Sequence, residues 1–174
     1  GLLQLRRGLD QMAALKAFAT RVGSTSRKHL KGTVTSMIPS FLESGGKLLK
    51  AKKTRAALAD YRRSAATLEA AGLRCASGIL HSRAAHAAYE IPNFKLGVRL
   101  LETAIEHCLA EKQERVAAGY VKRIAFYKKI DGDFEGGLAA LFRLEAIWRN
   151  LGERREIATV VSAQVTELTS LGRW

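Results

Sequence analysis

Four histidines are the side chains in this 174-residue chain best suited to bind a metal or transfer a proton. They are His29, His81, His86 and His107. His81 and His86 are five residues apart, whereas two ligands on one helix face are three or four apart. His86 stands between two alanines, which favours a packed side chain. The spacing therefore predicts no metal site.

Two other segments resemble the start of a binding loop without completing it. Asp131, Asp133 and Glu135 have the alternate spacing that opens a calcium loop, but no closing glutamate follows at the twelfth position. A turn with helix-capping acids explains them better. The segment 44–47, Ser-Gly-Gly-Lys, lacks both the earlier glycine and the hydroxyl residue of a phosphate loop. Neither a calcium site nor a phosphate site is predicted.

The remaining chemistry-bearing residues give no catalytic pattern. No Ser-His-Asp order, no HExxH and no glycine-rich nucleotide loop occurs. Cys75 and Cys108 are 33 residues apart and form no C-x-x-C motif. We expect two buried free thiols in a reducing compartment, with a disulfide or a metal site as the alternatives. The sequence thus predicts a non-enzymatic protein with no catalytic residue, no cofactor and no metal.

Charge is the strongest compositional signal. The formal net charge is +13, and residues 1–53 hold 11 Lys/Arg against 2 acids while residues 54–174 hold 18 against 14. A basic surface attracts nucleic acid, anionic lipid or an acidic protein face. We expect the basic N-terminal third to contact RNA or an acidic protein surface, with a solubility or targeting role as the alternative.

Eight cationic residues are the predicted partner-binding positions. Three lie in the most basic part of the chain, where turn-forming residues are dense. The other five lie at positions that are related by a 40-residue shift or adjoin one. Arginine suits bidentate contact with carboxylate or phosphate, and ordinary solvated charge is the alternative for each residue. The eight are Arg27, Lys28, Lys31, Arg83, Arg115, Lys122, Arg123 and Arg155.

A 40-residue repeat must position these residues. Residues 93–108 and 133–148 share an aromatic, a small residue and a bulky residue at the same spacing, and a weaker copy covers 53–68. Self-similarity at such a period indicates stacked helix pairs, because one pair cannot bury its apolar face alone. The apolar spacing and turn residues predict helices over 54–71, 75–90, 94–110, 113–130, 134–150 and 153–170. Ala57, Gly97 and Gly137 are predicted points of close helix approach.

The N-terminal part has a different pattern. Residues 1–21 are amphipathic, acid-poor and rich in arginine, which is also typical of a mitochondrial presequence. Residues 22–40 are dense in Gly, Ser and Thr and predict a linker, and residues 40–53 predict a helix interrupted at Gly45-Gly46. We therefore expect a basic N-terminal helix and linker over 1–40 and a repeat domain over 41–174. No apolar run reaches 18 residues, so no transmembrane segment is expected.

The last repeat resembles a known family. Gly132-Asp133-Phe134, then Gly137, Leu141 and the turn at Leu151-Gly152, is similar to the tetratricopeptide repeat. The stretches 101–106 and 115–131 are also similar to soluble NSF attachment proteins. The resemblance covers about 54–170. It implies an all-α fold of stacked antiparallel helix pairs, a tetratricopeptide-like α-solenoid of about three repeats.

The expected role is binding. We expect a non-catalytic scaffold for protein–protein interaction, or a structural subunit of a large multi-subunit complex, with other subunits as its partners. The mitochondrion is the expected compartment, and the cytoplasm and the cilium are the alternatives. Two other functions remain open. One is an RNA-contacting subunit of an organellar ribosome, and the other is a membrane-trafficking adaptor of the soluble NSF attachment type.

Overall fold

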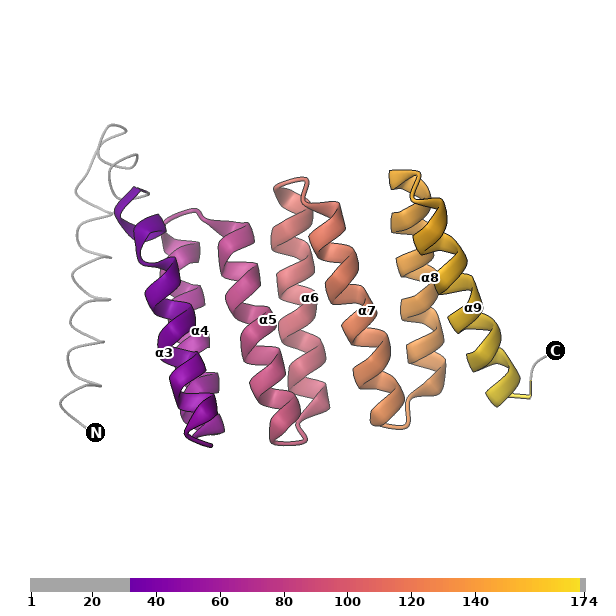
Figure 1. Ribbon diagram of the computed structural model, residues 1–174, viewed down its shortest axis with the longest axis horizontal. Coiled ribbons are helices and arrows are strands. Elements are labelled where there is room, and N and C mark those ends of the chain that lie inside the picture. Colours follow the sequence, from indigo (N-terminus) through magenta and orange to yellow (C-terminus); the bar gives the residue numbers. More distant parts are fainter. Residues whose placement is uncertain (1–31, 173–174) are drawn as a thin grey trace.

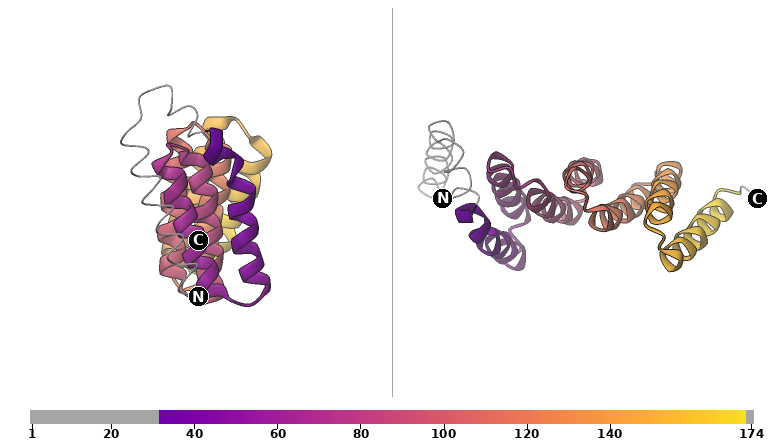
Figure 2. Two further views of the ribbon diagram at one scale, coloured as in Figure 1. Left: turned by 90° about the vertical axis from the view of Figure 1, so that its left-hand side faces the viewer. Right: turned by 90° about the horizontal axis from the view of Figure 1, so that it is seen from above.

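The computed structural model describes residues 32–172, and over this range the protein is entirely helical. Seven helices follow one another in an open row within the described residues (Figure 1). Seen from above, they alternate between two layers (Figure 2). The bounds are α3 Ile38–Lys50, α4 Thr54–Ala70, α5 Arg74–Glu90, α6 Phe94–Ala110, α7 Glu114–Ile130, α8 Phe134–Leu151 and α9 Arg154–Ser170. The predicted all-α class and the six repeat helices are confirmed.

The fold advances by one helix every 20 residues from α4 onward. Each turn between helices has a residue with positive φ at the same place, and four of these residues are glycines. The left-handed region costs little for glycine, so this residue ends a helix and redirects the chain. The positions are Lys52, Gly72, Pro92, Lys112, Gly132, Gly152 and Gly172. Two helices and two turns thus make up the 40-residue repeat.

Each helix packs mainly against the helices before and after it, as in a helical solenoid. The predicted stripe of α4 is buried, and α5 buries four alanines at positions 84, 85, 87 and 88. These small side chains let α5 lie close to both neighbours. The close approaches at Gly97 and Gly137 are confirmed, since an added Cβ would lie 2.9 Å from the Tyr127 ring and 3.3 Å from the Ala125 carbonyl oxygen respectively.

Two predictions about the start of the repeat domain were wrong. Residues 32–36 are helical rather than part of a linker, and α3 begins at Ile38. The helix also runs through Gly45-Gly46 without interruption. Gly45 is buried against the ring of Tyr61 on α4, where a side chain would collide. The glycine therefore serves helix packing, and tertiary contact outweighs its low helix propensity.

Candidate functional site

Three of the eight predicted partner-binding residues, Arg27, Lys28 and Lys31, lie outside the described residues. Two of the other five make contacts within the helical array. Arg115 on α7 pairs with Glu153 at the start of α9. Arg123, which is half-buried, donates a hydrogen bond of 2.7 Å to the Ser82 hydroxyl on α5. These two arginines therefore connect helices about one repeat apart.

The other three predicted cations, Arg83, Lys122 and Arg155, are exposed on α5, α7 and α9. Exposure leaves each of them available to a partner. The five described residues come from three different helices, and the structure does not gather them around one cavity. The cavity of the array has a different lining.

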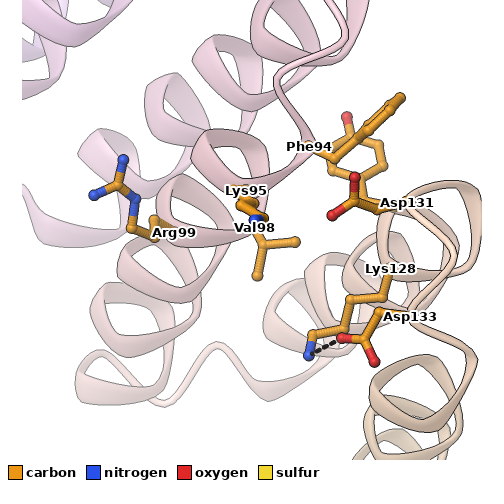
Figure 3. A pocket seen from close by; sticks show the side chains of 8 residues that line it. Phe94, Lys95, Val98, Arg99, Lys128, Asp131 and Asp133 are labelled. Atoms are coloured by element: carbon orange, nitrogen blue, oxygen red, sulfur yellow. Dashed lines mark hydrogen bonds and ion pairs between the residues drawn. The ribbon is translucent and has the colours of Figure 1, made fainter.

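A pocket of about 440 Å³ opens between α6 and the turn that joins α7 to α8 (Figure 3). Phe94, Val98 and Tyr127 supply its apolar surface. Five charged residues complete the lining: Lys95 and Arg99 on α6, and Lys128, Asp131 and Asp133 on the other side. Apolar surface with a few polar groups around it is the usual composition of a binding pocket.

An aromatic cluster supports the pocket from behind. Tyr89, near the end of α5, stacks on Tyr127 with ring centroids 5.2 Å apart and meets Phe94 edge-on at 5.7 Å. Tyr127 is 3% exposed, and its hydroxyl donates to the Ala85 carbonyl oxygen at 3.4 Å. Burial raises the pKa of Tyr127, so the phenol stays neutral. The cluster holds the pocket surface in place through rings from three successive helices.

The acidic side of the pocket is fixed by a helix cap. Asp133 Oδ1 accepts a hydrogen bond of 2.8 Å from the Gly136 amide, and its Oδ2 lies 3.1 Å from Lys128 Nζ. The Gly136 amide and then Lys128 hold the pKa of Asp133 below its usual value. Asp131 makes no side-chain hydrogen bond or ion pair within residues 32–172. Lys95 and Arg99 are exposed, so the pocket offers charges of both signs to a partner.

Large apolar side chains are exposed on α7 and at the start of α8. Phe126 is 49% exposed, Ile130 44% and Phe134 41%. Isolated exposed apolar residues are ordinary, whereas several close together in sequence beside a pocket suggest a contact surface. The sequence analysis assigned Phe94, Phe134 and their neighbours to the repeat core and missed the pocket. A signal was present, because tyrosine occurs at positions 89 and 127 without a counterpart one repeat later.

No helix within residues 32–172 is long and apolar enough to cross a membrane. A search against models of protein families finds no match to this chain. A search of curated proteins finds no significant match either. The structure shows a helical solenoid, and its likeness to tetratricopeptide or attachment proteins does not extend to a family assignment.

Proposed function

We propose that this protein is a non-catalytic interaction module that binds other protein subunits of a larger assembly. The pocket between α6 and the α7–α8 turn is the observation that carries the proposal. Its apolar surface fits one aromatic or aliphatic side chain of a partner segment. Its flanking charges fit a segment that carries both acidic and basic residues.

The open architecture supports this role. Because each helix packs chiefly on its neighbours in sequence, the row exposes much of every helix to possible partners. Repeat arrays of this kind present extended surfaces on which several contacts add together. We place the protein in the mitochondrion on the basis of its basic N-terminal third, and fractionation of cells that express the tagged chain tests this compartment.

A pull-down of the tagged full chain from its native source tests the function. The wild-type chain is compared with Val98→Asp, which puts a charge into the pocket, and with Lys95→Glu/Arg99→Glu, which reverses its two cations. Arg55→Glu/Arg62→Glu is the matched control, because both arginines are exposed on α4 and the change in net charge is the same. We expect the pocket variants to lose the protein partners and the control to keep them.

A second candidate function is RNA contact, which the net charge of +13 favours. Binding through many phosphates weakens steeply as salt rises, and nuclease abolishes it. The same pull-down is therefore washed at low and high salt, with and without nuclease. Partners that survive both treatments support the protein-binding function. Loss of every partner on nuclease treatment would overturn it in favour of RNA.

A further inference from the structure

Three potential metal ligands from three successive helices meet at one point of the array. Glu69 lies in the last turn of α4, His81 on α5 and His107 in the last turn of α6. One ligand atom from each residue lies within 4.8 Å of the other two. Two imidazoles and one carboxylate are a common ligand set for zinc.

The distances inside the cluster are close to those of a coordination sphere. His81 Nε2 lies 2.7 Å from Glu69 Oε1, and His107 Nδ1 lies 3.9 Å from the same oxygen. Ligand atoms around a tetrahedral zinc ion are roughly 3.3 Å apart, given metal–ligand distances of about 2.0–2.1 Å. Both separations are within about 1 Å of that value, a shift that side-chain rotation can supply.

The His107 ring nitrogen has no other use in the structure. His107 Nδ1 is buried and has no hydrogen-bond partner, and at 3.9 Å the Glu69 carboxylate is too far away to serve. A buried polar atom without a partner is costly and calls for an explanation. A cation between this nitrogen and Glu69 Oε1 would satisfy it.

The surroundings orient the cluster and leave it reachable. Ser77 donates a hydrogen bond of 3.0 Å to Glu69 Oε1, which fixes the carboxylate. The side chains of His81 and His107 are 13% and 20% exposed and that of Glu69 is 39% exposed, so an ion can enter from solvent. One repeat later the corresponding positions hold Leu109, Val121 and Ile147. The repeat itself therefore does not require these polar residues.

We propose that Glu69, His81 and His107 form a binding site for one divalent transition-metal ion, for which zinc is the best fit. Three protein ligands leave a fourth coordination position for water. The ion links α4, α5 and α6, and so stiffens the N-terminal half of the described array. The proposal does not depend on the partner-binding function.

A neighbouring pair of thiols is the competing ligand set. Cys75 Sγ and Cys108 Sγ lie 3.0 Å apart between α5 and α6, and Cys108 follows His107 directly. Metals bind the thiolate, and burial followed by the contact with Cys75 raises the pKa of Cys108 to about 12. The histidine–carboxylate cluster is therefore the better site at neutral pH, and the experiment must separate the two.

The test is titration of the metal-free full chain with Zn²⁺, followed by calorimetry and by competition with a chromogenic chelator. Glu69→Gln is the main variant, because it keeps the shape of the side chain while removing its charge. His107→Gln removes the nitrogen that lacks a partner. His86→Gln on α5 is the matched control, since His86 is half-exposed and lies 3.8 Å from Glu90 instead. Cys75→Ser/Cys108→Ser tests the thiols.

We expect one Zn²⁺ per chain and a higher melting temperature with the ion bound. Loss of groups that only support a ligand weakens metal affinity about 10–100-fold, so Glu69→Gln and His107→Gln should weaken it by about 100-fold or more. The His86 and double-cysteine variants should bind as the wild type does. With Co²⁺, the spectrum should lack the thiolate charge-transfer band.

Two outcomes would overturn the proposal. One is an unchanged Zn²⁺ affinity in both Glu69→Gln and His107→Gln while their helical circular dichroism is retained. The other is loss of binding only in the double-cysteine variant, with a thiolate band in the wild-type cobalt spectrum. Failure of a histidine variant to fold leaves Glu69→Gln to decide, because its carboxylate is the ligand most exposed to water.

Discussion

Tyr89 and Tyr127 at one repeat and Lys129 and Glu167 at the next occupy equivalent positions, 40 residues apart. The tyrosines stack behind the pocket, with ring centroids 5.2 Å apart. Lys129 and Glu167 form an ion pair between α7 and α9 instead. The same backbone positions thus hold a pair of rings in one place and a pair of charges in the other.

The neighbours of these pairs show the consequence. Phe94 is half-buried against Tyr89, whereas its counterpart Phe134 is 41% exposed because no ring occupies the position of Tyr127. The helix caps hardly differ: Asn93 accepts from Leu96 N at 3.1 Å and Asp133 from Gly136 N at 2.8 Å. The repeat therefore reproduces backbone and caps, while individual side chains determine where a pocket has an aromatic floor.

The largest expected difference concerns the two pairs themselves. Tyr127→Ala should lower the free energy of unfolding by about 3–5 kcal/mol, because it removes a fully buried ring. Glu167→Ala should cost at most about 1 kcal/mol, because Lys129 is about half-exposed and can turn to water. Urea unfolding of both variants measures the two losses. Equal losses would show that the pairs do the same work.

The next difference concerns the two glycines at equivalent positions. Gly97→Ala should destabilise by about 1–2 kcal/mol, because the new methyl group would lie 2.9 Å from the Tyr127 ring. Gly137→Ala should be within about 0.5 kcal/mol of the wild type, since better helix propensity offsets a contact of 3.3 Å. A double-mutant cycle with Tyr127→Leu is the check. The penalty at Gly97 must shrink there if the ring causes it.

The two helix caps should be equal in size and different in pH dependence. Asn93→Ala and Asp133→Ala should each cost about 1 kcal/mol at neutral pH. The pKa of Asp133 is lowered by folding, so its stabilising contribution is present above its ordinary value of 3.8 and is lost as pH falls through the lower folded value. Melting temperatures at neutral and acidic pH measure this. Asp133→Ala should approach the wild type in acid, while Asn93→Ala should not.

The smallest effect is expected at the turns after α6 and α8. Lys112 has a φ of 57° and Gly152 a φ of 71°, and the two positions are one repeat apart. Lys112→Gly should stabilise by about 0.5 kcal/mol, because relief of the left-handed conformation exceeds the added chain entropy. Gly152→Lys should destabilise by a similar amount. Thermal unfolding of both decides, and a change of the same sign in both would contradict the argument.

Most of the fold could be predicted because its signals are local. Turn residues recur every 20 positions, and apolar residues recur at helical spacing between them, so the bounds of α4 to α9 follow to within a residue or two. The exception is α3, where Gly45-Gly46 indicated an interruption. A glycine pair weakens a helix locally, but the ring of Tyr61 needs the space that Gly45 leaves.

The candidate sites were largely hidden from sequence reasoning. The cations at Arg115 and Arg123 were predicted to bind a partner, but they contact Glu153 and Ser82 instead. The histidines were compared only within one helix, whereas His81 meets His107 from the next helix, 26 residues further on. A spacing rule for one helix cannot detect ligands that three helices contribute.

The sequence by itself determined the helices, their turns and the 20-residue advance, because these depend on propensity and periodicity along the chain. Only the tertiary structure decided which side chains meet. The lateral positions and orientations of neighbouring helices bring Phe94 to Tyr127 and Glu69 to His107. These positions result from the packing of buried alanines and glycines all along the helices, and no single segment of the sequence contains that information.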